Sequence, residues 1–211
     1  MSNRSSRYIR FRAYPSLVGT TRRPANTDVD TTPSAPGDLE LVRGFLSLHD
    51  HVAGTRDSLP PSSETIAWWL RDRGLLAGDE VPAEAELRWA AQILEAFRSR
   101  VGENMGAPAD ADAIRVLDRA ARETGLSLDF GDKALRPDAL GVRGAVGRIL
   151  AIAFLAELDG SWSRFKGCSS PTCRAVFWDR SKNRSGRWCT MKDCGNRAKV
   201  RAYRERERAT A

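Results

Sequence analysis

Residues 168–197 read CSSPTCRAVFWDRSKNRSGRWCTMKDCGNR, and this stretch holds all four cysteines of the 211-residue chain. Cys168 and Cys173 form one pair and Cys189 and Cys194 the other. Each pair has four intervening residues, and fifteen residues separate the two pairs. Two close pairs joined by a loop of this length are typical of a tetrahedral four-thiolate zinc site. We therefore expect each pair to lie on a tight turn and an intervening hairpin to bring the pairs together.

Zinc suits this ligand set because thiolates are its preferred soft ligands and no redox change is needed. A closed shell of four thiolates leaves no position for water, so one structural zinc ion per chain is expected. Two other interpretations use the same cysteines: a pair of disulfides, or an iron–sulfur cluster. We expect a cytoplasmic protein, because no secretory or twin-arginine signal is recognisable. A reducing compartment disfavours disulfides, whereas the spacing alone does not exclude a cluster.

The residues between the cysteine pairs predict a hairpin. Residues 174–178 are expected to form one strand, 181–186 a turn and 187–189 the returning strand. The aromatic side chains in this region are Phe177, Trp178 and Trp188. They could cover the metal site or stack on nucleic-acid bases, and we favour metal cover because a small zinc module has few other apolar groups.

A helix is expected from about residue 193 to 207, and its arginines fall on one stripe at 100° per residue. Val200 and Tyr203 lie to one side of that stripe and are expected to pack on the hairpin. Residues 161–211 carry 14 basic and 4 acidic side chains, whereas residues 38–160 carry 14 basic and 21 acidic. A solvated helix face would explain the arginine stripe alone. A basic surface that extends over this whole region favours a phosphate partner. A helix that carries arginines also fits the major groove of DNA. The predicted contacts are Arg180, Lys182, Arg184, Arg187, Arg197, Arg201, Arg204 and Arg208.

The rest of the chain predicts a basic arm at residues 1–37 and a mostly helical domain at residues 38–160. The arm is rich in Arg, Ser, Thr and Pro and is expected to be disordered. A shift to basic, cysteine-bearing sequence near Gly160 marks the start of the third region, residues 161–211. The fold class is therefore α+β and mostly α. The predicted elements are helices at residues 39–52, 63–74, 82–101, 114–124 and 137–154 and a short strand at residues 126–130.

No pattern in the sequence predicts an enzyme or a membrane protein. His49 and His51 would point to different faces of a helix, so we interpret them as a surface pair. Gly141, Gly144 and Gly147 fit neither nucleotide-binding fingerprint and are better explained by close helix packing. The longest apolar run is eight residues, Ile149 to Ala156, whereas a membrane-spanning helix needs about 20.

The cysteine-bearing region resembles the CGNR zinc finger family. The resemblance rests on the two cysteine pairs, on Phe177-x-Asp179-x-Ser181, and on the CGNR tetrapeptide, residues 194–197. It implies a zinc-bound, DNA-binding module in which Arg197 and Lys199 match basic residues of the family motif, so Lys199 is also a predicted nucleic-acid contact. In that family the finger usually follows an ABATE domain, which is associated with stress-induced transcription regulation. Residues 38–160 have the size and helix order of an ABATE-like domain.

These features together predict a zinc-dependent DNA-binding transcriptional regulator. The finger would contact DNA, and the N-terminal domain would sense a small-molecule effector or form a homodimer, because one finger reads only a short site. Three alternatives stay open: an RNA-binding finger that stacks bases on its aromatic residues, a protein-docking zinc module, and a small-molecule sensor built on the N-terminal domain.

Overall fold

The computed structural model describes residues 32, 34–53, 55, 57–77 and 79–210. Its elements are α1 (Leu39–Leu46), β1 (Asp50–His51), β2 (Ser58–Leu59), α2 (Ser63–Asp72), α3 (Glu84–Glu103), α4 (Ala111–Glu123), β3 (Ser127–Asp129), β4 (Ala134–Arg136), α5 (Gly141–Leu158), the 3-10 turn η1 (Ser161–Arg164), β5 (Phe165–Gly167), β6 (Val176–Trp178), the π-helical turn η2 (Met191–Gly195) and α6 (Asn196–Thr210). The strands form three antiparallel pairs, β1–β2, β3–β4 and β5–β6. The predicted mostly helical α+β class is confirmed. Most of the predicted arm, residues 1–37, lies outside the described residues.

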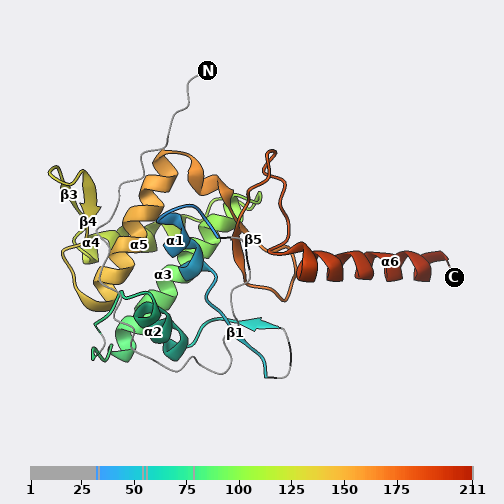
Figure 1. Ribbon diagram of the computed structural model, residues 1–211, viewed down its shortest axis with the longest axis horizontal. Helices are drawn as coiled ribbons and strands as arrows, with labels where there is room; N and C mark the ends of the chain where they lie inside the picture. Colours follow the sequence, from blue (N-terminus) through green and yellow to red (C-terminus); the bar gives the residue numbers. More distant parts are fainter. Residues whose placement is uncertain (1–31, 33, 54, 56, 78, 211) are drawn as a thin grey trace, which may run out of the picture.

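The main core lies where α1, α2, α3 and α5 pack together (Figure 1). Each helix contributes apolar side chains that water does not reach. Those that are almost completely buried include Val42, Phe45, Ile66, Leu70, Ile93, Leu94, Val142 and Ile149. Burial of one such side chain favours folding by about 1.5–3 kcal/mol, so this set accounts for the helical arrangement.

The second helix begins and ends where the sequence predicts. Ser62 caps α2, because its Oγ accepts a hydrogen bond from the backbone N–H of Thr65 at 3.2 Å. Gly74 has a φ of +63°, a left-handed conformation that glycine adopts without steric cost and that ends a helix. The short strand predicted after α4 and the turn that follows it are also present as β3 and its connection to β4.

The first predicted helix is shorter than expected, because α1 ends at Leu46 instead of near Val52. The residues that follow α1 make other contacts. Ser47 Oγ donates to the backbone carbonyl of Val176 at 2.6 Å. Asp50 accepts from the Ser62 N–H at 2.9 Å, and in β1 it lies opposite Leu59 of β2. This segment therefore connects α1 to α2 and to the cysteine-bearing region instead of extending the helix.

Two large apolar residues of the predicted helices stay outside the core. Ile114 of α4 is 40% exposed, whereas Ala113 and Ala120 of the same helix are buried. Small side chains at these two positions bring α4 close to its neighbours, and Leu117 packs against the core from the same helix. Phe154 of α5 is 54% exposed and does not join the core.

Gly144 and Gly147 of α5 are closely packed, as predicted, but mainly against the chain that precedes α5, and Gly141 instead has a φ of +60°. A Cβ at Gly144 would lie 2.4 Å from the carbonyl oxygen of Ala139, and a Cβ at Gly147 would lie 2.6 Å from Pro137 Cβ. Both distances are far below ordinary carbon contacts. The glycine spacing is therefore explained by the approach of the chain that precedes α5.

The main core continues beyond Gly160. A row of aromatic rings runs from Phe97 of α3 to Trp162 of η1, then to Phe165 of β5 and Trp178 of β6. The three successive centroid distances are 5.7, 5.2 and 5.0 Å. The two strands that flank the first cysteine pair are thus built into the helical core. The division into domains at Gly160 stays a prediction.

The last helix leaves the body of the molecule. α6 extends outward from η2, and its distal end lies well away from the other elements (Figure 1). Val200 and Tyr203 are 43% and 57% exposed, so the prediction that they pack on the hairpin is wrong. Of the helices in the described ranges, none combines the length and apolarity needed to cross a bilayer.

Candidate metal centre and basic surface

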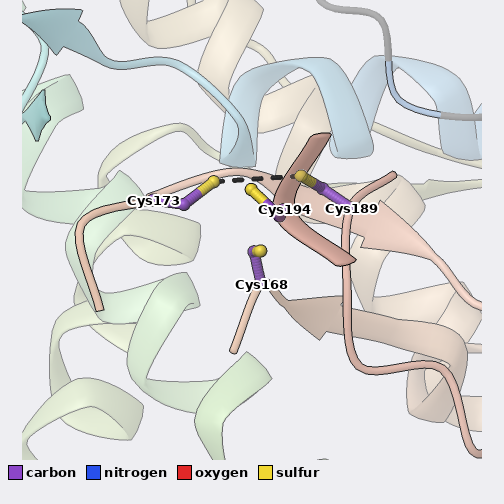
Figure 2. A group of neighbouring side chains, drawn as sticks. All are labelled: Cys168, Cys173, Cys189 and Cys194. Carbon is purple, nitrogen blue, oxygen red and sulfur yellow. Dashed lines mark hydrogen bonds between the residues drawn. The ribbon is translucent and has the colours of Figure 1, made fainter. Parts of the chain in front are cut away.

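The four cysteine sulfurs converge on one point (Figure 2). Cys168 follows β5, Cys173 precedes β6, Cys189 follows the long loop after β6, and Cys194 lies in η2. The four Sγ atoms all lie within 4.8 Å of one another, and those of Cys173 and Cys189 are 3.9 Å apart. The predicted constellation is therefore assembled by the fold.

Each cysteine pair lies on a tight turn, as the spacing predicts. In the first turn the N–H of Cys173 donates to the carbonyl of Ser170 at 3.1 Å. In the second, Thr190 caps η2 by accepting a hydrogen bond from the N–H of Asp193 at 3.2 Å. The N–H of Gly195 closes the same turn on the carbonyl of Thr190 at 3.0 Å.

The sulfur cage has the size that one tetrahedral metal ion requires. Four sulfurs at the usual zinc–sulfur distance of 2.3 Å would be about 3.8 Å apart, close to the spacing observed here. All four cysteines are free thiols, and the 3.9 Å between Cys173 and Cys189 is well beyond the bond length of a disulfide, about 2.05 Å. An iron–sulfur cluster inserts several atoms between its thiolates and needs a wider cage. The residues present therefore fit a single thiophilic ion.

The thiols are coupled to one another through hydrogen bonds. Donation from the Cys173 thiol, and from that of Cys189, lowers the pKa of Cys168 to about 2. The hydrogen bond to Cys168, with burial, raises the pKa of Cys173 to about 12 and also raises the pKa of Cys189. Hydrogen bonds among these three thiols thus favour the thiolate form at Cys168 and the neutral form at Cys173 and Cys189. Four thiolates need a cation at their centre, so metal binding must release protons.

Two neighbouring aromatic residues of β6 point to opposite sides of the strand. Phe177 packs with Ala175, Cys189 and Cys194, and Trp188 covers the same cluster from outside. Trp178 instead packs in the main core against Phe165. Metal cover is confirmed for Phe177 and Trp188 and is wrong for Trp178. The period of two along a strand explains the difference.

The hairpin beside the cysteines uses a different partner strand from the predicted one. β6 pairs with β5, with Phe165 opposite Trp178, and residues 187–189 form no strand. The reason lies in the loop that follows β6, whose backbone donors are satisfied by a side chain. Asp179 accepts hydrogen bonds from the N–H groups of Ser181 and Gly186, both at 2.9 Å.

Asp179 organises this loop and was missed as a functional residue. Its carboxylate is 3% exposed and lies 3.1 Å from Lys166 Nζ. These hydrogen bonds and the ion pair outweigh burial, and they lower the pKa of Asp179 to about 2. A Cβ on Gly186 would lie 2.8 Å from the Asp179 carboxylate, so the loop closes tightly over it. The signal available in the sequence was a lone acid in a basic stretch between two cysteine pairs.

The basic residues predicted to bind nucleic acid lie in two places. Arg180, Lys182, Arg184 and Arg187 lie on or beside the loop closed by Asp179, where Arg184 has a φ of +50° and donates to Ser163 Oγ at 2.6 Å. Arg187 lies 5.6 Å from the Trp188 ring centre. Arg201, Arg204 and Arg208 are exposed along α6. Lys199, on the first turns of that helix, is exposed as well.

Arg197 is directed toward the cysteines. Its Nη2 donates to Cys194 Sγ at 3.1 Å, and its Nε lies 3.3 Å from Asp193 Oδ1. The first arginine of the stripe therefore contacts the metal centre, while the next three are exposed to solvent.

The metal centre is fastened to the helical body by polar contacts as well as by the shared core. Arg98 of α3 donates to the carbonyls of Leu48 and Arg174, both at 2.8 Å. Burial, together with the neighbouring charge of Arg174, lowers the pKa of Arg98 to about 10. Asn104 donates to the carbonyls of Trp162 and Phe165, both at 3.0 Å. A half-buried arginine or asparagine on a helix gives no sequence signal for its partner, so these contacts were not predictable.

The two histidines are arranged differently from the prediction. They follow α1 in an extended segment instead of a helix, and their rings meet edge to face with centroids 4.8 Å apart. His49 Nδ1 lies 2.6 Å from the carbonyl oxygen of Ser47. The cysteine cluster is the only group of three or more metal-ligating side chains among the described residues, so the histidine pair forms no second such group there.

Comparison with known families agrees with this geometry. Residues 164–207 match the model of the CGNR zinc finger family, and the matched stretch includes the four cysteines, the loop closed by Asp179 and most of α6. A search of curated proteins finds no match to the chain.

Proposed function

We propose that this protein is a zinc-dependent DNA-binding transcriptional regulator. The observation that carries the proposal is the position of α6. Its first turn contacts the cysteine cluster through Arg197, the helix extends beyond the other elements (Figure 1), and its residues Arg201, Arg204 and Arg208 are exposed. A ligand with many phosphates is the chemistry that such a surface fits best.

In this proposal Cys168, Cys173, Cys189 and Cys194 hold one zinc ion. The ion supplies a rigid structural centre and no catalytic position, because its four ligands are all protein thiolates. Zinc is favoured over other ions by the all-sulfur donor set and by the match to a zinc finger family. The cysteines would be kept reduced in the cytoplasm.

The dimensions of α6 suit the major groove. A helix of 15 residues is about 22 Å long, and the groove of B-DNA is about 12 Å wide. Arg201, Arg204 and Arg208 lie within a narrow stripe of this helix, where they can contact phosphates or guanine edges. Lys182 and Arg187, on or beside the loop closed by Asp179, would make further contacts to the DNA phosphate backbone. The buried Asp179 carboxylate holds this loop in a fixed geometry.

The helical body has a supporting role in the proposal. It fixes the metal centre through Arg98, Asn104 and the shared aromatic core, so that α6 is presented in one orientation. Its resemblance to an ABATE domain in sequence suggests that it senses a small-molecule effector or forms a homodimer. No catalytic step is assigned to it.

A second candidate is binding to single-stranded RNA, which the 57% exposure of Tyr203 favours. Single-strand recognition relies on bases that stack on exposed aromatic rings. Trp178 is buried in the main core and Trp188 is half-buried over the cysteines, so Tyr203 would have to carry most of the stacking. The exposed arginines are better matched to a duplex.

The proposal is tested by selecting from a random duplex library with the zinc-loaded full chain at near-physiological salt, beside a chelated sample. Enrichment of a short duplex sequence that requires zinc would support it. Preference for single strands over duplex would favour the second candidate. Absence of nucleic-acid binding in both samples would contradict both candidates and direct attention to a protein partner.

A further inference from the structure

Arg197 differs from the three arginines that follow it on the same stripe of α6. Its guanidinium donates to Cys194 Sγ and pairs with Asp193. By contrast, Arg201, Arg204 and Arg208 are exposed, and none of them forms an ion pair with another described residue. One arginine of the stripe thus has a partner within the protein that the others lack.

Helix geometry explains why Arg197 reaches the metal centre. Side chains on an α-helix tilt toward its N-terminus, so a residue in the first turn of α6 extends back over η2. Cys194, which is 2% exposed, lies there three residues earlier. Asp193 holds the Nε side of the guanidinium at 3.3 Å, which leaves Nη2 directed at the sulfur at 3.1 Å.

The charge of four thiolates explains why a hydrogen bond from Arg197 to Cys194 Sγ would stabilise the metal centre. Four thiolates around a divalent ion carry an excess of two negative charges, and Cys194 is one of the two buried ligands. Burial of uncompensated charge is costly, and a hydrogen bond from a cation to a ligating sulfur disperses it. Outer partners of this kind orient metal ligands and affect metal affinity by about 10–100-fold.

We propose that Arg197 is a positioning residue of the metal centre and not a contact to DNA phosphate. It holds the Cys194 thiolate in its ligating orientation and links that ligand to the first turn of α6. This inference rests on the metal binding proposed above and is independent of whether the partner is DNA.

The first test measures zinc affinity of the full chain by competition with a chelator of known affinity. The variants are Arg197→Gln, Arg197→Lys and, as a matched control with the same loss of charge on the same stripe, Arg201→Gln. We expect about a tenfold weaker affinity for Arg197→Gln. Arg197→Lys should lose less, because it keeps the charge but not the fork, and Arg201→Gln should match the parent. Equal zinc affinity in the Arg197→Gln and Arg201→Gln proteins would overturn the proposal.

The second test uses duplex DNA at saturating zinc and measures how binding falls with salt. Arg197→Gln should leave the salt slope of the parent unchanged, whereas Arg201→Gln should reduce it by about one unit. A reduced slope for Arg197→Gln together with unchanged zinc affinity would make Arg197 a phosphate contact and overturn the proposal. If no variant binds DNA, the proposed function fails while the zinc measurement still decides the role of Arg197.

Discussion

The two halves of the cysteine-bearing region are stabilised in different ways. The first half, β5 and β6, lies in the main core, where Phe165 is fully buried and Trp178 is 7% exposed. The second half, η2 and α6, contributes Cys194 to the cysteine cluster, and the last turns of α6 are exposed. Short strands with a large aromatic core need no metal to stay in place, whereas a lone charged helix of about 15 residues is marginal in water.

This difference assigns separate tasks to the two halves. The first half fixes the metal centre on the helical body, through the aromatic row and through Arg98 and Ser47. The second half carries the exposed arginines, and in the proposed zinc-bound protein the metal would attach it to the helical body. In that proposal the metal joins a folded body to a projecting helix.

Metal removal should have the largest effect, and it should be local. We expect a chelator, or acidification that protonates the thiols, to release η2 and α6, because a structural zinc site contributes about 10–16 kcal/mol of binding energy. Helices α1 to α5 should stay folded, since their core contains no cysteine. Hydrogen exchange with and without chelator, read segment by segment, measures this.

A Cys173→Ser variant serves as the control for chelation. Its exchange pattern without added chelator should match that of the stripped parent protein. Loss of protection throughout α3 and α5 in either sample would contradict the separation of the two halves.

Adjacent residues of β6 allow the comparison to be sharpened. Trp178→Ala should lower the free energy of unfolding of the whole chain by about 3–5 kcal/mol, because it leaves a cavity in the main core. Phe177→Ala should act mainly on the metal centre, and its clearest sign should be faster zinc loss to a chelator. Denaturant unfolding and zinc-release kinetics, measured on both variants, test this. If the loss of unfolding free energy and the rise in zinc-release rate stand in the same ratio in Trp178→Ala and Phe177→Ala, β6 does not separate the main core from the metal site.

The loop closed by Asp179 should show a smaller effect with a defined pH dependence. Because its folded pKa is depressed to about 2 from an ordinary value near 4, the carboxylate stabilises the protein above about pH 4. This contribution, about 2 kcal/mol, is lost as the pH falls through 2. We expect Asp179→Asn to be less stable at pH 7 by about this amount. The difference from the parent, measured by unfolding at several pH values, should shrink toward pH 2, and a difference that is constant with pH would contradict the role of the charge.

The smallest effect on stability is expected at the exposed aromatic of α6. Tyr203→Ala should change the free energy of unfolding by no more than about 0.5 kcal/mol, because the side chain is 57% exposed and outside both apolar clusters. Its duplex affinity should also stay near that of the parent. A loss of single-strand binding larger than the loss of duplex binding would instead support the second candidate function.

The sequence predicts the metal centre well because ligand spacing and residue chemistry are local. Cys168, Cys173, Cys189 and Cys194 meet as expected. Ser62 begins α2 with its side-chain cap, and Gly74 ends it because glycine adopts a left-handed backbone conformation without steric cost. The close packing at Gly147 was likewise apparent from its spacing. Each of these features depends on a residue type and a distance along the chain.

The features that were wrong depend on distant partners. Trp178 and Phe177 are adjacent aromatic residues that the sequence alone does not distinguish. Only the pairing of β6 with β5 places Trp178 in the main core. The helix after Gly37 stops early because Ser47 meets Val176, which lies 129 residues away. The stripe of arginines was predicted from the helix period alone. That period does not show that the Arg197 side chain is directed at Cys194 Sγ instead of at solvent.

The salt dependence of duplex binding tests the central claim most directly, with the zinc-loaded parent compared with an Arg201→Gln, Arg204→Gln double variant. Each phosphate contact releases counterions and adds about 0.9 to the slope of log affinity against log salt. If α6 binds DNA with its arginine stripe, the double variant should bind more weakly with a slope lower by about two units. Equal affinity and equal slope in the two proteins would show that α6 does not contact DNA.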